Sequence, residues 1–265
     1  MVTDAIFRAF RRSPQIQRQF KRALVRFPSR RREVLHFGQR LWVDPTELHG
    51  FHLYYEHEYD DYIFKFLGKR LGSFARALDI GANIGIYTNF LAARINRVDA
   101  FEPEVQVLPK LRANLSLNGL SHVQIHEVCI ANVSGQINFQ RANKQNQGKG
   151  KIVQGNAAVA YPCITLDDFF AGAIGEPCLI KMDIEGGEWL ALQGARRVLS
   201  DPSVPVSLLI EVHPAEIASL GGSVPELKFL LEAMGFRVYG LTSTGLQPMP
   251  AGLHDRFWWA SSTPE

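Results

Sequence analysis

The sequence predicts an α/β fold built around a mainly parallel sheet. From Ala77 onward, short apolar runs alternate with longer amphipathic stretches, which is typical of repeated βαβ units. The 265 residues are 46% hydrophobic, which is enough apolar surface to exclude disorder as the main state. No run approaches the roughly 18 uncharged apolar residues that a membrane-spanning helix needs. This length suits one large domain with an extension, or two small domains.

The expected strands and helices alternate along the chain. Strands are predicted at the apolar runs 75–80, 97–101, 123–130, 178–184 and 206–212. Helices are predicted at 84–95, 105–117, 189–199 and 226–234, where apolar residues recur three and four positions apart. The runs 237–241 and 256–260 are expected to pair as the last two strands. In the second of them, one ring of Trp258 and Trp259 should face the core and the other its rim.

The N-terminal segment is much more basic than the rest of the chain. Residues 1–40 contain 11 Lys and Arg against two acids, whereas the remainder carries 18 basic and 24 acidic residues. Apolar spacing in the first 35 residues predicts two amphipathic helices separated by Pro14. We therefore expect a basic helical extension at residues 1–49 and one domain at residues 50–265. The extension packs on the sheet or a partner subunit, contacts an anionic membrane or polyanion through residues 1–35, or is a transit peptide.

Two other segments depart from the alternating pattern. Residues 140–156 are polar, with four basic and no acidic residues, and are expected to be a solvated loop or a loop that touches substrate. Residues 51–64 are rich in tyrosine and acids, which favours an amphipathic helix packed on the sheet. The alternative is a roof over the ligand, with His57 and Glu58 as contacts. The three cysteines, Cys129, Cys163 and Cys178, show no CxxC spacing and are expected to be packing residues.

The most informative motif is the glycine turn between the first predicted strand and helix. Its residues are Asp79, Gly81, Asn83 and Gly85. Glycines at this point let a ligand lie against the backbone, next to the free N–H groups of a helix start. The spacing lacks the G-x-G-x-x-G of dinucleotide sites. An Asp at the strand end would repel a phosphate and attract an ammonium or a sulfonium.

A second acidic residue, Glu102, closes the next predicted strand. A carboxylate there can accept two hydrogen bonds from a ribose diol, as in both NAD and adenosyl sites. Together, the acidic first turn and the acidic second strand end indicate a cationic adenosyl ligand, of which S-adenosylmethionine is the common one.

Several motifs resemble the FkbM-type family of S-adenosylmethionine-dependent methyltransferases. They are LDIGANIGIYT (Leu78 to Thr88), FEPE (Phe101 to Glu104), NGL (Asn118 to Leu120), TLDDF (Thr165 to Phe169), KMDIEGGEW..L.G (Lys181 to Gly194) and IEVHP (Ile210 to Pro214). The resemblance covers roughly residues 61–214 and implies a class I methyltransferase, with a Rossmann-like, mainly parallel seven-stranded sheet whose last strand is reversed. It also implies methylation of sugars, glycans, lipids or natural products, usually on oxygen.

Carried onto this chain, the resemblance implies roles for seven residues in cofactor binding. Asp79, Gly81, Asn83 and Gly85 would surround the methionine part, and Glu102 the ribose. Cys129 and Ile130, at the end of the third predicted strand, would lie near the adenine, although small apolar residues there serve equally well as core.

The acceptor side is expected at the carboxyl ends of the fourth and fifth predicted strands. Asp183 and Glu185 are two residues apart, as are Glu211 and His213, so these four groups should converge. His213 suits the role of general base, with Asp183 as the competing base. A divalent cation held by Asp183, Glu211 and His213 is the less favoured alternative. Lys181 is expected to pair with a neighbouring acid.

We expect transfer of a methyl group from S-adenosylmethionine to a hydroxyl oxygen of a saccharide, glycolipid or secondary metabolite. The alternatives are an NAD(P)-dependent reductase, and a non-catalytic module that binds a membrane or polyanion through a degenerate methyltransferase core. A cytoplasmic location is expected, with or without peripheral contact at the inner face of the membrane. Nucleic acid is the less favoured partner, because no aromatic-interleaved basic platform appears after residue 40. The sequence does not indicate the oligomeric state.

Overall fold

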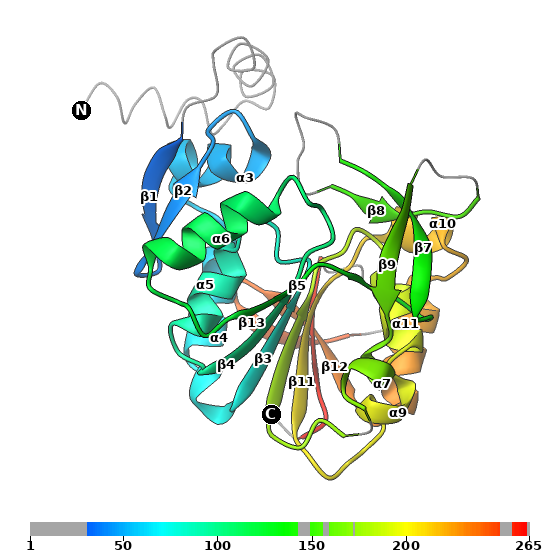
Figure 1. Ribbon diagram of the computed structural model, residues 1–265. Helices are drawn as coiled ribbons and strands as arrows, with labels where there is room; N and C mark the ends of the chain where they lie inside the picture. The colour runs from blue at the N-terminus through cyan, green and yellow to red at the C-terminus, as the bar shows by residue number, and fades with distance from the viewer. Residues whose placement is uncertain (1–30, 143–148, 156–158, 172, 250–255, 264–265) are drawn as a thin grey trace.

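The computed structural model describes residues 31–142, 149–155, 159–171, 173–249 and 256–263, and its centre is an eight-stranded sheet (Figure 1). The strand order is β13-β12-β14-β11-β10-β3-β4-β5. The strands are β3 (Arg76–Ile80), β4 (Arg97–Phe101), β5 (Gln124–His126), β10 (Cys178–Met182), β11 (Val206–Glu211), β12 (Arg237–Thr242), β13 (Gly245–Pro248) and β14 (Phe257–Ser261).

The sheet has the topology of a class I methyltransferase. Strands β3, β4, β5, β10 and β11 are parallel, and β14 runs antiparallel to both β11 and β12. The mainly parallel sheet and the reversed last strand were predicted. Strand β13, which pairs with β12 through a turn at Thr242–Gly245, is an eighth strand that was not predicted from the sequence.

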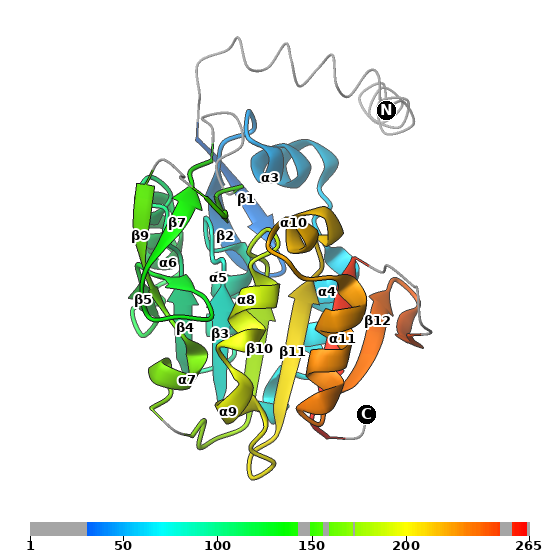
Figure 2. The ribbon, with the colours of Figure 1, turned by 90° about the vertical axis from the view of Figure 1, so that its right-hand side faces the viewer.

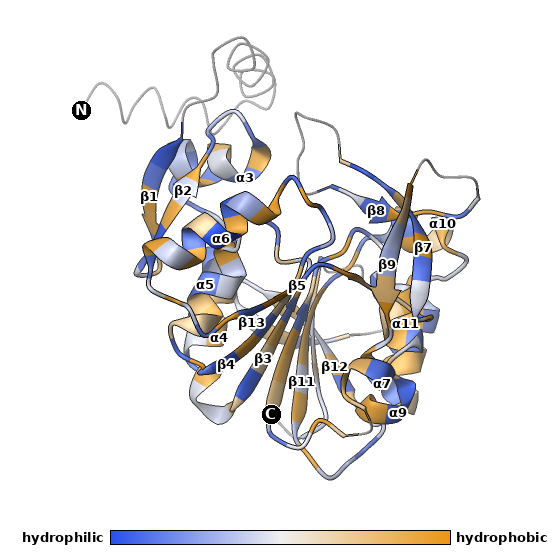
Figure 3. Cartoon of the chain, viewed as in Figure 1, coloured by the Kyte–Doolittle hydropathy of each residue, from blue (hydrophilic) through white to orange (hydrophobic). Residues whose placement is uncertain are grey.

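Helices cover both faces of this sheet (Figures 1 and 2). One face carries α4 (Asp61–Gly68), α5 (Ile86–Ala92) and α6 (Leu108–Leu117). The other carries α7 (Leu166–Phe169), α8 (Glu188–Gln193), α9 (Arg196–Leu199) and α11 (Val224–Ala233), while α10 (Pro214–Ser219) lies at the carboxyl ends of β10 and β11. Every residue of β3, β10 and β11 is buried, as parallel strands covered on both faces require. Figure 3 shows the hydrophobic residues along these central strands.

The two tryptophans of β14 both lie in the core. Trp258 is 0% exposed and packs on one face of the sheet, and Trp259 is 1% exposed and packs on the other. The expectation that one ring would face the rim is wrong. Adjacent strand residues point to opposite faces, and both faces of this sheet are covered by helices.

A second, four-stranded sheet stands beside the carboxyl ends of the main one. Its order is β6-β9-β7-β8, with β6 (Cys129–Ile130), β7 (Gly135–Gln140), β8 (Lys151–Ile152) and β9 (Val159–Ile164). The single strand predicted at 123–130 is therefore wrong. Gln124–His126 pair with β4, whereas Cys129–Ile130 pair with β9. The hydrophobic pattern continues across this change of partner, so the pattern alone does not show it.

The described part of the N-terminal segment is a β-hairpin, formed by β1 (Arg32–His36) and β2 (Gln39–Val43). Asn114 and Asn118 of α6 accept hydrogen bonds from the backbone N–H groups of Trp42 and Arg40, at 2.7 and 3.0 Å. The expectation of a helical extension is wrong for residues 32–43, which are extended and packed on the domain. The two helices expected within residues 1–35 lie almost entirely outside the described residues.

The tyrosine-rich segment is not one helix. After α3 (Leu48–Phe51), a π-helical turn covers His52–Glu56, and α4 begins at Asp61. Between them, His57 and Asp60 have left-handed φ angles of 53° and 50°. A short 3₁₀ turn at Leu71–Ser73 then leads into β3. No helix within the described ranges is long and apolar enough to cross a membrane.

Gly81 lies where the carboxyl ends of the two central strands, β3 and β10, come together. Its φ is +82°, and a Cβ on it would lie 2.0 Å from the backbone oxygen of Asp183, which follows β10. The turn after β3 and the loop after β10 therefore touch through their backbones. Only glycine permits both this φ and this approach.

We predict that Gly81→Ala destabilises the protein by about 2–4 kcal/mol, since it adds a steric overlap to the strain of a left-handed alanine. Gly119 is the matched control, because its φ is +68° but no atom lies within 4 Å of the position that a Cβ on it would take. Gly119→Ala should cost only about 1 kcal/mol. Urea unfolding of both variants measures the difference, and equal losses would contradict the close approach as the cause.

Candidate active site

A cleft of about 670 Å³ lies at the carboxyl ends of β3, β4 and β10. The strand order changes direction between β3 and β10, which is where open α/β sheets bind their ligands. The turn after β3, the residues after β4, strand β6 and the loop after β10 form its walls.

The cleft is lined by five of the residues predicted to hold the cofactor. They are Gly81, Asn83, Glu102, Cys129 and Ile130. Gly85 lies behind the wall as the N-cap of α5, and a Cβ on it would come within 2.7 Å of the Leu111 side chain. Gly85 therefore permits close packing of α5 on α6.

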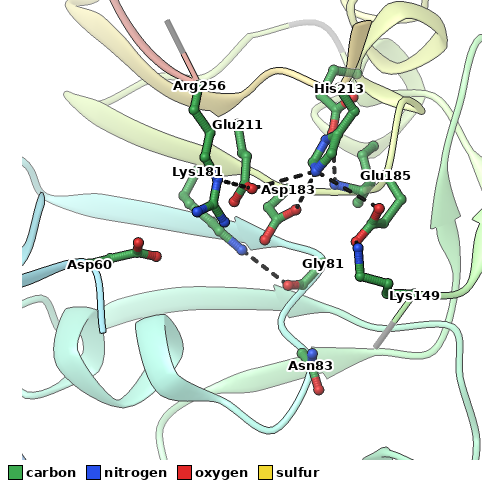
Figure 4. Close-up of polar contacts among 12 residues, drawn as sticks. Asp60, Gly81, Asn83, Lys149, Lys181, Asp183, Glu185, Glu211, His213 and Arg256 are labelled. Atoms are coloured by element: carbon green, nitrogen blue, oxygen red, sulfur yellow. Dashed lines mark hydrogen bonds and ion pairs between the residues drawn. The ribbon is translucent and has the colours of Figure 1, made fainter. Parts of the chain in front are cut away.

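Asp79 also lies behind the wall, where it is fully buried. Its Oδ1 is 3.1 Å from Nζ of Lys181, and its Oδ2 accepts a 2.6 Å hydrogen bond from Thr88. Lys181 also donates to the backbone oxygen of Gly81 at 3.1 Å (Figure 4). This ion pair fits the expectation for Lys181. It commits the Asp79 carboxylate to the protein, whereas we expected from the sequence that it would attract the ligand directly.

The charge of Lys181 is stabilised by its surroundings. Burial alone would lower the pKa of its ammonium, but the carboxylates of Asp79 and Asp183 raise that pKa above the ordinary value. Its Nζ also lies 5.0 Å from the ring centre of Tyr87, a favourable cation–π distance. Lys181 is thus a permanent cation beneath the glycine turn.

Glu102 presents its carboxylate at the cleft. The oxygens accept hydrogen bonds from the backbone N–H groups of Asn83 (2.8 Å) and Glu104 (2.9 Å). Burial raises the pKa of Glu102 to about 7, although these two hydrogen bonds oppose the shift. Each carboxylate oxygen can accept a further hydrogen bond, so Glu102 keeps acceptor capacity for a ligand diol.

Asn83 offers a second acceptor. Its side-chain Nδ2 lies 3.3 Å from Nδ1 of His49, but its Oδ1 is buried with no hydrogen-bond partner among the described residues. An unsatisfied buried oxygen costs free energy, so a donor supplied by a ligand is favoured there.

The opposite end of the cleft is apolar. Cys129 and Ile130 reach it from β6, together with Phe101 and Val128. Burial raises the pKa of the Cys129 thiol far above its ordinary value, so this cysteine is a packing residue. All three cysteines are free and buried, as expected.

Sequence reasoning missed His49, whereas it offered two interpretations of residues 140–156, one of them a loop that touches substrate. His49 lines the cleft from α3, and burial lowers the pKa of its imidazole to about 4, which leaves it neutral. Gly150 and Ile152 line the cleft too, and Lys149 lies 3.5 Å from Glu185. For the described residues 149–152, this geometry favours the interpretation of a segment that can touch a ligand. In contrast, His57 and Glu58 are exposed.

The four groups predicted on the acceptor side converge around the imidazole of His213 (Figure 4). Its Nε2 lies 3.5 Å from Glu211, 3.8 Å from Glu185 and 3.9 Å from Asp183. A fourth carboxylate, that of the fully buried Glu188, lies 3.6 Å from Nδ1. Glu188 opens α8 and was not predicted.

These carboxylates determine the protonation of His213. Burial alone would lower the pKa of the imidazole, but hydrogen bonding with Glu188 and Glu211 and the nearby charges raise it to about 11. His213 is therefore a cation at neutral pH, and it has no free lone pair to accept a proton. Sequence reasoning used the intrinsic pKa near 6.5, which does not apply beside four carboxylates.

Asp183 and Glu211 differ sharply from each other. Burial raises the pKa of Asp183 to about 7, and Glu211 raises it further, while Lys181 and His213 oppose the shift. Burial alone would raise the pKa of Glu211 as well, but His213 and Arg256 stabilise its negative charge and lower that pKa to about 2. Arg256 donates from Nε to Glu211 at 2.6 Å. Of these two carboxylates, Asp183 is therefore the one that exchanges a proton near neutral pH.

This cluster offers possible metal ligands, but they differ from the set of Asp183, Glu211 and His213 that the sequence predicted. Ligand atoms of Asp183, Glu188 and His213 lie within 4.8 Å of one another. Glu211, which was predicted as a member of this set, is engaged by Arg256. The cations His213, Arg256 and Lys149 already neutralise much of the carboxylate charge.

Comparisons with known proteins identify the family to which the chain belongs. Residues 79–238 match the family model described as the methyltransferase FkbM domain. The chain is similar to the crystal structure of a methyltransferase FkbM from Methylobacillus flagellatus KT, with 22% sequence identity and a TM-score of 0.43. That match covers 71% of this chain, and the chain spans only 44% of the other protein.

A TehB-like SAM-dependent methyltransferase from Corynebacterium glutamicum is also similar, with 12% identity and a TM-score of 0.44. That match covers 80% of this chain and 91% of the other protein. No curated protein sequence matches the chain at a significant level. Because the family match spans residues 79–238, which is more than half of the 265 residues, the chain belongs to the FkbM methyltransferase domain family.

Proposed function

We propose that this protein transfers a methyl group from S-adenosylmethionine to a hydroxyl oxygen of a saccharide, glycolipid or secondary metabolite. The observation that supports this most is the combination of two features in one cleft. Glu102 offers a carboxylate to a ribose diol at one wall, and Asp183 offers a proton acceptor at the other.

The residues of the cleft fit this cofactor. The unsatisfied Oδ1 of Asn83 can accept a hydrogen bond from the ammonium group of its methionine part. Glu102 can accept from the ribose hydroxyls, and the apolar wall of Phe101, Val128 and Ile130 suits an adenine ring. When bound, the cofactor supplies an electrophilic methyl group on a positively charged sulfur.

The protein then has two tasks, which are to align the acceptor oxygen with that methyl carbon and to take the hydroxyl proton. Asp183 lines the cleft and titrates near pH 7, so it is the best placed base. The hydroxyl proton would pass to a carboxylate oxygen of Asp183 as the methyl carbon leaves the sulfur and joins the acceptor oxygen. His213 and Lys181 hold that carboxylate between two fixed positive charges.

We predict that Glu102→Gln weakens S-adenosylmethionine binding about 10- to 100-fold, since it removes a charged acceptor worth about 1.5–3 kcal/mol. Isothermal titration calorimetry measures this change. Glu127→Gln is the control, because Glu127 is exposed and pairs with Arg112 outside the cleft. Tight binding of NADH by the wild-type protein, without binding of S-adenosylmethionine, would favour the reductase alternative.

The pH dependence of turnover distinguishes the two candidate bases. A base must be deprotonated, so kcat should rise with pH through about 7, the pKa of Asp183, and then stay level. Asp183→Asn should lower kcat about 10²- to 10⁴-fold. His213→Asn removes a positive charge, so the rise in kcat should move to higher pH by about one unit while activity persists at high pH.

Loss of activity in His213→Asn at every pH would instead support His213 as the base. The melting temperature of each variant shows whether the fold is retained. Loss of wild-type turnover on chelation, restored by Mg²⁺, would favour the metal alternative, with Asp183, Glu188 and His213 as the ligands.

Peripheral membrane contact through residues 1–35 is a separate proposal, supported by the basic composition of residues 1–40. Deletion of residues 1–30 should abolish sedimentation with anionic liposomes at low salt and leave methylation of a soluble acceptor intact. Liposome binding that survives the deletion would contradict the contact. Loss of methylation of the soluble acceptor would assign these residues to the fold or the active site.

A further inference from the structure

The segment before α4 holds a carboxylate that the proposed reaction does not use. Asp60 is half-buried, and its left-handed φ of 50° is uncommon for a residue other than glycine. His57, three residues earlier, is left-handed as well. Such backbone strain costs about 1–3 kcal/mol per residue and is retained mostly where a side chain must be placed accurately.

The strained segment places Asp60 opposite the acceptor-side charges. In Figure 4 its carboxylate points toward Arg256 and Lys181, the two positive charges that act on it most directly. The Oδ2 atom accepts a 3.1 Å hydrogen bond from the hydroxyl of Tyr87, and Oδ1 has no hydrogen-bond partner in the described ranges. Burial raises the pKa of Asp60, but the positive charges of Arg256 and Lys181 oppose this and favour the ionised form.

Arg256 is the positively charged group toward which the Asp60 carboxylate points. Its Nε is taken by Glu211, but within the part of the chain that the structure describes its two terminal NH₂ groups have no hydrogen-bond partner. The side chain is 64% exposed even though Glu211 holds it at its base. A fixed guanidinium thus presents free donors where Asp60 presents a free acceptor.

We propose that Asp60 and Arg256 together orient the acceptor, and that this acceptor is an uncharged polyhydroxylated saccharide. A sugar diol can donate a hydrogen bond to Asp60 and accept one from Arg256 at the same time. Within the described residues, Glu211 neutralises Arg256 and Asp79 neutralises Lys181, whereas Asp60 has no ion-pair partner. The unpaired charge at this wall is therefore negative, so a phosphate or carboxylate on the acceptor is repelled. This inference rests on the proposed methyl transfer and narrows its substrate class.

The link to the reacting centre is short. Asp183 lines the cofactor cleft and also interacts electrostatically with Glu211, the residue that holds Arg256. Tyr59, the neighbour of Asp60, stands 5.5 Å from the ring of His49, which lines the same cleft. An acceptor held between Asp60 and Arg256 would therefore border the place where Asp183 meets the cofactor.

The test compares Asp60→Asn with Asp61→Asn in the full-length protein. Asparagine tolerates the left-handed conformation, so the first variant keeps the fold while losing the charge. Asp61 is the matched control, because it is the adjacent carboxylate and accepts a local hydrogen bond from the backbone N–H of Tyr59, at 3.2 Å. The probes are three fluorescently tagged oligosaccharide pools, one neutral, one containing uronic acids and one phosphorylated, with methylation read by mass spectrometry.

The wild-type protein should methylate the neutral pool. Asp60→Asn should raise the KM for the neutral pool at least about tenfold, with little change in kcat or in the Kd for S-adenosylmethionine. The ratio of kcat/KM for the neutral pool to kcat/KM for the acidic pool should fall. Arg256→Gln should raise the same KM, and Asp61→Asn should change neither constant.

An unchanged KM in Asp60→Asn, or a wild-type preference for the acidic or phosphorylated pool, would overturn the inference. Binding of S-adenosylmethionine without methylation of any pool would overturn the substrate class and leave cofactor use intact. No binding of S-adenosylmethionine would overturn the proposed function itself. Calorimetry on the same samples separates these last two results.

Discussion

The buried ion pair between Lys181 and Asp79 holds the active site together. It joins the two central strands at their carboxyl ends, and its lysine also donates to the backbone of Gly81. Removing one partner of a buried ion pair leaves an uncompensated charge, at a cost of about 3–5 kcal/mol. The glycine turn, the wall of the cleft and the placement of Asp183 all depend on this one contact.

The pair also explains why the charge pattern of the acceptor side is stable. Lys181 supplies a positive charge next to Asp183, and His213 supplies another, so several carboxylates can share a small volume. His213 cannot act as a proton acceptor in this arrangement, because an imidazole among four carboxylates stays protonated. Asp183, whose pKa is raised to about 7, remains as the proposed proton acceptor, and it lines the cleft.

The sequence predicted the parallel sheet and the convergence of Asp183, Glu185, Glu211 and His213, because both follow from strand periodicity and from the shared edge of parallel strands. It did not predict the direction of the pKa shift at His213, which depends on Glu188 from a neighbouring helix. It placed Asp79 at the ligand because a strand-end acid is readable from sequence, whereas the pairing with a lysine on a strand far along the chain is not. His49 and Asp60 were missed, since only the tertiary packing of α3 brings His49 to the cleft and only the packing of the segment before α4 brings Asp60 close to Arg256.

A crystal structure with S-adenosylhomocysteine bound is the sharpest test of this arrangement. We expect the ribose hydroxyls on Glu102, the adenine against Ile130, and the amino group of the ligand at Oδ1 of Asn83. The sulfur should point toward Asp183. A ligand whose ribose lies away from Glu102, or whose sulfur points away from Asp183, would contradict the proposed site.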